Sequence, residues 1–420
     1  MAIKVGVVGA AGYAGVELVR LLISHPDFEL TAITSNADAG QSLASVYPAF
    51  AGVCDLAFTT HDDPVLKTCD AVFLAVPHTA ALAAVPGLLA AGVSVFDLSA
   101  DYRLSDPAVY EKWYATPHTS PELLAARTFG LPEIFAEDLA SAAARHAAGE
   151  ATLVACAGCY PTATSLGAYP AIDAGWLADG AVVIVDAISG VTGAGKSANA
   201  RTHYCSADEC VEAYGVCKHR HTPEIEQILG LPDHVVFTPH LAPLKRGLLS
   251  TINIPLAEVP AQELTLDMVV ERYREFYEGR PFVRVLDAGQ MPKTSSVAGS
   301  NACQIGLALN GHLLSDVTDI RDLQNVGLLD REPSECSVGI GHDTRRGTLD
   351  HDGGTGQRHV VACIQHTYVD ALLLLLDYFY LFNMLLTLFY SLFFSALRIG
   401  GGNYHDTPEQ RKTTVVKNFS

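Results

Sequence analysis

One cysteine of this sequence stands in a context that favours nucleophilic chemistry. Cys159 follows a short apolar stretch and Gly158, and Pro161 comes two residues later. Proline is typical of the first turn of a helix, so the pattern predicts a strand that ends before Cys159 and a helix that begins there. The positive end of the helix dipole favours a thiolate. Most cysteines are buried and inert, and the predicted turn is what favours a catalytic role here.

Other cysteines allow different chemistry. Cys156 forms a Cys-x-x-Cys pair with Cys159, so a redox or metal-binding role is the alternative, but the flanking glycine and proline suit a strand-to-helix turn better than a redox loop. Cysteines and histidines also gather between residues 203 and 221, without the paired spacing of structural zinc sites. We therefore predict packing thiols and no metal site, in a reducing compartment.

A candidate proton carrier lies in the segment 218–227, KHRHTPEIEQ, which places two histidines and two cations before a predicted helix. Histidine titrates near neutrality, so His219 can take a proton from a thiol and return one to a developing alkoxide. The alternative is that both histidines only cap or pack. We predict the catalytic role for His219 and assign His221 to the lesser role.

Two further segments offer donors for oxyanions. Arg103 lies in the segment DLSADYR, and the loop 189–196 reads SGVTGAGK. Arginine forks and glycine-rich backbone amides both bind carboxylates and phosphates. We predict substrate contacts from Arg103, Ser189 and Lys196, and cofactor contacts from Gly190 and Gly193. A surface ion pair is the alternative for Arg103.

A glycine turn near the start of the chain predicts a dinucleotide site. It reads Gly-x-x-Gly-x-x-Gly between a strand and a helix, where backbone N–H groups can approach a phosphate. A tight turn that needs small residues is the bland alternative. The second strand ends in Thr-Ser-Asn rather than in an acid, which favours NADP over NAD because hydroxyl and amide groups can donate to a 2′-phosphate. The predicted cofactor contacts here are Gly9, Gly12, Tyr13, Ala14, Gly15 and Ser35.

The hydrophobic pattern predicts an α/β fold with two domains and a tail. Buried strands over residues 3–8, 30–34, 71–76 and 93–98, with helices over 16–23 and 80–91, predict a Rossmann-like doubly wound parallel sheet in residues 1–150. Strands over 182–188 and 248–254 indicate a second, α+β substrate and catalytic domain in residues 151–314. Residues 315–420 form a divergent tail, and its apolar segment 371–397 is long enough to cross a bilayer.

Composition narrows the classes of partner. Of 420 residues, 49% are hydrophobic and 17% charged, and the formal net charge is -19. A nucleic acid requires a basic face, which this acidic chain lacks, so a nucleic acid is excluded as a partner. The first residues lack the pattern of a secretory signal. We expect a cytoplasmic protein with a small-molecule substrate.

Residues 1 to about 314 resemble the N-acetyl-gamma-glutamyl-phosphate reductases of arginine biosynthesis. The resemblance rests on the segments GAAGYAG, FDLSADYRL, FGLPEIF, AGCYPTATS, SGVTGAGK, THYCSADECVEAYGV and KHRHTPEIEQ. It implies NADP-dependent reduction of N-acetyl-gamma-glutamyl phosphate to N-acetylglutamate 5-semialdehyde and phosphate. Cys159 would form a thioester, His219 would act as acid and base, and the chain would form a homo-oligomer. An aspartate-semialdehyde dehydrogenase is a similar alternative, which AGCYPT and KHRHTPEIEQ disfavour.

The resemblance ends after residue 314. Members of this family continue with a segment like DNLVKGAAGQAVQN and a closing helix, whereas this chain continues with SDVTDI. The tail is either a membrane anchor or the product of an altered reading frame. More cations follow the apolar segment than precede it, which would leave the enzyme outside the cell, so we favour the altered frame. A catalytically impaired nucleotide-binding remnant is the alternative function.

Overall fold

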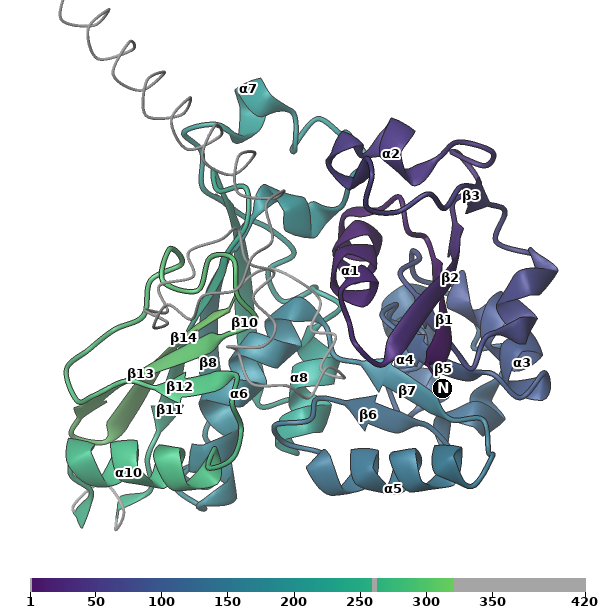
Figure 1. Cartoon of the computed structure of the whole chain (residues 1–420). Helices are drawn as coiled ribbons and strands as arrows, with labels where there is room; N and C mark the ends of the chain where they lie inside the picture. Colours follow the sequence, from purple (N-terminus) through teal and green to yellow (C-terminus); the bar gives the residue numbers. More distant parts are fainter. Residues whose placement is uncertain (1, 259–262, 321–420) are drawn as a thin grey trace, which may run out of the picture. The chain divides into compact units, whose positions relative to one another are not determined.

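A computed structural model describes residues 2–258 and 263–320. In these residues the chain forms two seven-stranded sheets (Figure 1). The first sheet has the order β3-β2-β1-β4-β5-β7-β6, and its neighbouring strands are parallel. Its strands are β1 (Ile3–Val8), β2 (Phe28–Thr34), β3 (Phe58–Thr59), β4 (Ala71–Leu74), β5 (Ser94–Asp97), β6 (Thr128–Gly130) and β7 (Leu153–Cys156).

The first sheet is buried by apolar side chains on both faces, as the β-branched run of β1 requires for a parallel sheet. Its helices are α1 (Tyr13–Ile23), α2 (Leu43–Val46), α3 (Ala81–Ala90), α4 (Pro107–Tyr114) and α5 (Ala136–Ala147), with 3₁₀ turns η1 (Pro48–Phe50), η2 (Pro64–Thr68) and η3 (Pro121–Leu124). The predicted Rossmann-like class is confirmed. β7 pairs with β5 and β6, so this sheet extends past the boundary placed at residue 150.

The second sheet is mixed, with the order β12-β13-β14-β11-β8-β10-β9. Its strands are β8 (Val183–Gly190), β9 (Glu212–Ala213), β10 (Val235–Ala242), β11 (Leu248–Pro255), β12 (Val283–Val285), β13 (Cys303–Asn310) and β14 (Leu313–Ile320). Its helices are α6 (Cys159–Asp173), α7 (Tyr204–Ala207), α8 (Thr222–Leu229) and α10 (Leu266–Phe276), with the 3₁₀ turn η4 (Val191–Ala194). Helices α6 and α10 contact both the sheet and each other, so they cover one of its faces.

The last described strand corrects the expected start of the tail. β14 does not stop at Leu314 but continues to Ile320, paired with β13 on one side and β11 on the other. Within it, Leu314 and Ile320 point into the core. The second sheet therefore includes six residues that the sequence pattern assigned to the tail.

The rest of the predicted tail, with the apolar segment 371–397, lies outside the described residues. Within the described ranges, none of the helices has both the length and the apolar character needed to cross a bilayer.

Candidate active site

Four of the predicted site segments follow strands of the first sheet, and they lie at one edge of it because parallel strands end on the same side. The glycine turn follows β1, and Ser35 follows β2. Arg103 lies a few residues after β5, and Cys159 follows β7. The strand order reverses direction around β1 and β4, which is where doubly wound sheets bind their ligands.

The glycine turn can accept only glycine at two of its positions. Gly9 has φ +81°, and a Cβ there would lie 2.3 Å from the Ala75 carbonyl oxygen. A Cβ at Gly15 would lie 2.2 Å from the Gly9 carbonyl oxygen. Gly12 is the N-cap of α1, so the helix begins at Tyr13, earlier than the residue 16 expected from the apolar pattern. Free N–H groups at this helix end can face a phosphate, so the cradle fits a dinucleotide.

Two side chains border this turn. Ser35 is buried, and its hydroxyl donates to the Asp38 carboxylate at 2.7 Å. Lys196, which comes from the loop after β8, donates from Nζ to the Ala11 carbonyl at 3.1 Å and lies over the Tyr47 ring. The structure thus brings Lys196 to the cofactor turn, while its predicted substrate contact stays a prediction.

Cys159 begins α6, as the Gly-Cys-Tyr-Pro pattern predicted. Gly158 is the N-cap with φ -70° and ψ 162°, and Cys159 is half-buried. Cys156 at the end of β7 differs, because burial raises the pKa of its thiol to about 12. Neither cysteine forms a disulfide with a described residue. A buried thiol that stays protonated is a poor redox partner, which favours the interpretation of Cys156 as a packing residue.

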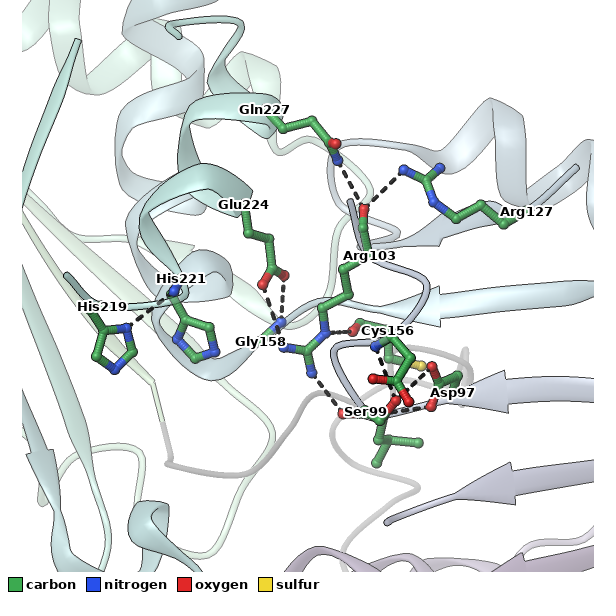
Figure 2. Close-up of polar contacts among 12 residues, drawn as sticks. Asp97, Ser99, Arg103, Arg127, Cys156, Gly158, His219, His221, Glu224 and Gln227 are labelled. Atoms are coloured by element: carbon green, nitrogen blue, oxygen red, sulfur yellow. Dashed lines mark hydrogen bonds and ion pairs between the residues drawn. The ribbon is translucent and has the colours of Figure 1, made fainter. Parts of the chain in front are cut away.

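Arg103 lies beside the nucleophile turn and is only 3% exposed (Figure 2). Its Nε donates to the Cys156 carbonyl at 2.8 Å, and Nη2 donates to the Leu98 carbonyl at 2.7 Å. Nη1 lies 3.4 Å from the carboxylate of Glu224, which also accepts the Gly158 N–H at 2.8 Å. The structure replaces the surface ion pair with a buried one. The predicted substrate contact of Arg103 is untested.

His219 sits among aromatic rings, with ring centroids 5.6 Å from Tyr160, 5.4 Å from Tyr214 and 5.3 Å from Phe237. Burial, with a smaller contribution from Arg220, lowers the pKa of His219 to about 4. Its Nδ1 lies 3.2 Å from the His221 backbone N–H (Figure 2). A backbone N–H can only donate, so Nδ1 accepts and the neutral ring carries its proton on Nε2.

His221 lies closer to the nucleophile turn than its assigned packing role suggests. A Cβ on Gly158 would lie 2.7 Å from His221 Nε2 and 2.7 Å from Arg103 Nη1, so a glycine is needed at this close approach. Burial, then His219 and Arg103, lowers the pKa of His221 well below its usual value. Its Nδ1 is buried and accepts no hydrogen bond from a described residue.

The loop after β8 serves packing in part. Ser189 is buried, and its hydroxyl donates to the Gly190 carbonyl at 3.0 Å. A Cβ on Gly190 would lie 2.9 Å from the Leu244 carbonyl oxygen, so the close approach of the loop 244–246 already requires a glycine. Gly193 lies within η4. The substrate and cofactor contacts predicted for these residues are untested.

The sequence prediction missed Glu224. Its segment predicts the opening of a helix, and Glu224 does lie in the first turn of α8. Its partner Arg103 is 121 residues away, and no local pattern signals that pairing. Within residues 2–258 and 263–320, no cluster of three or more histidines, cysteines or carboxylates could hold a metal ion.

Comparison with known proteins agrees with this geometry. Residues 4–142 match the family described as semialdehyde dehydrogenase, NAD binding domain, and residues 159–315 match the semialdehyde dehydrogenase dimerisation domain. Solved structures of aspartate semialdehyde dehydrogenase from Candida albicans, with NADP, and from Vibrio cholerae have TM-scores of 0.60 and 0.58. They cover 80% of this chain and 98% and 96% of theirs, at 15% and 13% identity, and so show the fold alone.

The fold and the cysteine turn define a nicotinamide-dependent oxidoreductase of the semialdehyde dehydrogenase class. The N-acetyl-gamma-glutamyl-phosphate reductase of Halorhodospira halophila is 45% identical over 73% of this chain and 85% of its own length. That of Pseudomonas putida is 43% identical over 84% of this chain and 99% of its own length, a span that must reach beyond residue 320. The chain belongs to the N-acetyl-gamma-glutamyl-phosphate reductase family.

Proposed function

We propose that this chain reduces N-acetyl-gamma-glutamyl phosphate to N-acetylglutamate 5-semialdehyde and phosphate, with NADP as its cofactor and Cys159 as its nucleophile. The observation that carries the proposal is the position of Cys159. It begins α6 at the carboxyl edge of the first sheet, which is also the edge that carries the glycine turn. Relatives of this name at 43–46% identity support the choice of substrate over the aspartyl analogue.

The proposed reaction needs a thiolate that attacks the acyl carbonyl carbon. A carbon–sulfur bond forms, the carbon–oxygen bond to phosphate breaks, and a thioester remains on Cys159. The nicotinamide, when bound, supplies the hydride. Hydride addition to the thioester gives a thiohemiacetal oxyanion on Cys159. This oxyanion then reforms a carbonyl, the carbon–sulfur bond breaks, and the Cys159 thiolate is restored as the aldehyde leaves. Attachment of the acyl group to sulfur keeps the carbonyl in place between the two steps.

We propose that His219 acts first as a hydrogen-bond donor. The low pKa of about 4 keeps the ring neutral near pH 7, and the Nδ1 acceptor leaves the proton on Nε2. A neutral Nε2–H can stabilise negative charge that develops on the substrate oxygen. This differs from the role inferred from the sequence, in which His219 also takes the thiol proton, because that step requires a free Nε2.

The preference for NADP is supported by the end of β2, where Thr34 and Ser35 stand in place of an acid. Asp38 is close by but accepts the Ser35 hydroxyl. The substrate contacts that we propose are Ser189 and Lys196. Arg103, which the sequence predicted as a third, has its guanidinium nitrogens bound to Cys156, Leu98 and Glu224, so we propose that it acts through the nucleophile turn. The cofactor contacts that we propose are Gly9, Gly12, Tyr13, Ala14, Gly15, Ser35, Gly190 and Gly193.

We also propose a cytoplasmic homo-oligomer formed through the face of the second sheet opposite α6 and α10. Ile184 on β8 and Val236 on β10 are direct partners in the register and are 44% and 42% exposed. Neighbouring exposed β-branched side chains on a sheet face favour burial against another protein surface. The match of residues 159–315 to a family described as a dimerisation domain makes a second copy the proposed occupant.

The reaction can be tested in the reverse direction. Purified chain, NADP, phosphate and N-acetylglutamate 5-semialdehyde should give NADPH only when phosphate is present, and Cys159→Ala should abolish it. Aspartate 4-semialdehyde serves as the competing substrate. Binding of NADP without turnover would contradict the proposal and support the nucleotide-binding remnant instead.

A further inference from the structure

The backbone turn that presents Cys159 is held at three consecutive residues. The Cys156 carbonyl accepts from Arg103 Nε at 2.8 Å, and the Ala157 N–H donates to the Gly130 carbonyl at 3.2 Å. The Gly158 N–H donates to the Glu224 carboxylate at 2.8 Å. As an N-cap, Gly158 has an N–H that points away from the helix, so a partner from elsewhere is needed. Two of the three partners are the charged side chains of one ion pair.

We propose that Arg103 and Glu224 are positioning residues that together hold the 156–158 turn in the geometry that aims Cys159 at the substrate. This inference rests on the proposed nucleophilic role of Cys159. Figure 2 shows both side chains converging on the turn, Arg103 from the loop after β5 and Glu224 from α8. Each side chain contacts the turn and its partner simultaneously.

The pair is itself rigidly held. Arg103 is 3% exposed and Glu224 is 1% exposed. The backbone carbonyl of Arg103 accepts from Gln227 Nε2 at 3.0 Å and from Arg127 Nη2 at 2.9 Å (Figure 2). Gln227 lies one turn after Glu224 on α8, so the same helix fixes both ends of Arg103. A side chain locked by packing and by hydrogen bonds can hold a catalytic turn more tightly than a loop can by itself.

The pair also sets the charge around the sulfur. Burial acts to lower the pKa of Arg103, but Glu224 and, among smaller contributions, a Cys159 thiolate raise it above its usual value. The guanidinium cation is therefore within electrostatic range of the sulfur, and the Glu224 carboxylate offsets part of its charge. Replacement of that carboxylate by an amide should leave more positive charge to favour the thiolate. An amide oxygen can still accept from the Gly158 N–H, but the amide N–H₂ group then faces the Arg103 guanidinium, so the contact that joins the two side chains is lost.

Loss of the Glu224 charge should therefore lower kcat and, at the same time, favour the Cys159 thiolate. These two effects together separate positioning from general loss of structure. We expect Glu224→Gln to lower kcat by about 10- to 100-fold while KM for substrate and cofactor change little, because only the aim of the nucleophile is lost. The pH midpoint for alkylation of Cys159 by iodoacetamide, followed by peptide mass spectrometry, should fall by roughly one unit. A loosened fold would change KM and would raise that midpoint toward the ordinary cysteine value of about 8.5.

Glu226→Gln is the matched control, since Glu226 is on the same helix and half-buried, and its carboxylate bonds to the backbone of Asp233 instead of the turn. Its kcat and its alkylation midpoint should equal those of the unchanged chain. An unaltered kcat in folded Glu224→Gln, or a midpoint that rises, would overturn the inference. Alkylation needs no substrate, so a shifted midpoint in a chain without reductase activity would contradict the proposed function alone.

Arg103→Lys decides the matter if Glu224→Gln does not fold. Lysine keeps the charge but cannot contact the Cys156 carbonyl, the Leu98 carbonyl and Glu224 together. We expect kcat to fall with no shift in the alkylation midpoint, and the inference fails if kcat is unchanged. If neither variant folds, Gln227→Leu removes one support of Arg103 without an unpaired charge, and the same fall in kcat, smaller in size, is required.

Discussion

The buried carboxyl group of Asp316 should make the stability of this protein depend on pH. Asp316 lies on β14 and is completely buried. One carboxyl oxygen accepts the Thr318 hydroxyl at 2.5 Å, and the other makes no hydrogen bond to a described residue. Burial raises the pKa of Asp316 from 3.8 to about 7, and the Thr318 hydroxyl opposes that rise only in part. Asp316→Asn replaces the acid by a group of the same shape that cannot ionise.

The magnitude follows from the two pKa values. Asp316 binds its proton more tightly in the folded state than in the unfolded state. Its contribution to the free energy of unfolding is therefore fully present below pH 3.8 and is lost as the pH rises to about 7. A difference of about 3 units at about 1.4 kcal/mol each amounts to roughly 4 kcal/mol above pH 7. Asparagine resembles the protonated acid, so Asp316→Asn should raise the free energy of unfolding by roughly 4 kcal/mol at pH 8 and roughly 2 kcal/mol at pH 5.

Urea unfolding of both proteins between pH 4 and pH 8 measures this difference directly. Other titrating groups contribute equally to both proteins and cancel. Asp186→Asn is the control, because Asp186 is exposed on β8 of the same sheet, and it should have no comparable effect. A gain for Asp316→Asn that is absent, or that stays constant across this pH range, would refute the argument that the carboxyl group ionises in a buried place.

Three further predictions concern the cofactor turn and the sheet face. Gly15→Ala should weaken NADP binding about tenfold or more and lower the free energy of unfolding by about 1–3 kcal/mol, because its Cβ would meet the Gly9 carbonyl at 2.2 Å. Gly87→Ala should have neither effect, because a Cβ on Gly87 would have no atom within 4 Å. Equal NADP affinities for the two variants in a binding titration would contradict the role of Gly15. Ser35→Asp should lower the ratio of kcat/KM for NADP to that for NAD by about 10-fold or more, since a carboxylate repels a 2′-phosphate; an unchanged ratio would remove Ser35 from the site. Ile184→Lys should convert the dimer into a monomer, as measured by light scattering, and activity per site should be measured on the same samples. If the chain without the substitution is already a monomer, the proposed dimer face is wrong.

Features that depend on neighbouring residues could be predicted from the sequence. The β1 run and the glycine turn are local, because a buried strand requires apolar residues and a turn with φ +81° at Gly9 requires glycine. The start of α6 at Cys159 was confirmed for the same reason, since Gly158 and Pro161 specify a helix end within a few residues. Apolar periodicity predicts a later start for α1, at residue 16, because this pattern does not include the N-cap at Gly12.

Features that depend on distant residues could not be predicted. Glu224 has the sequence context of an ordinary first-turn acid of a helix, which the dipole alone would favour. Its contacts with Gly158 and Arg103 join residues 66 and 121 positions apart. His219 shows the same limit in its chemistry. Histidine is a group that titrates near neutrality, but burial, with a smaller contribution from Arg220, lowers the pKa of His219 to about 4, and the His221 N–H fixes its proton on Nε2.

β14 shows how backbone pairing can continue where the side chains stop favouring it. This strand lies between β13 and β11, so without it β12 and β13 would lose their connection to the rest of the sheet. The main-chain hydrogen bonds of a ladder do not depend on side chains, and Leu314 and Ile320 anchor both ends of the inward face. Between them, Asp316 and Thr318 occupy positions where apolar residues would pack better. The sheet therefore retains the strand at the cost of a buried acid, and the pH dependence of Asp316→Asn measures that cost.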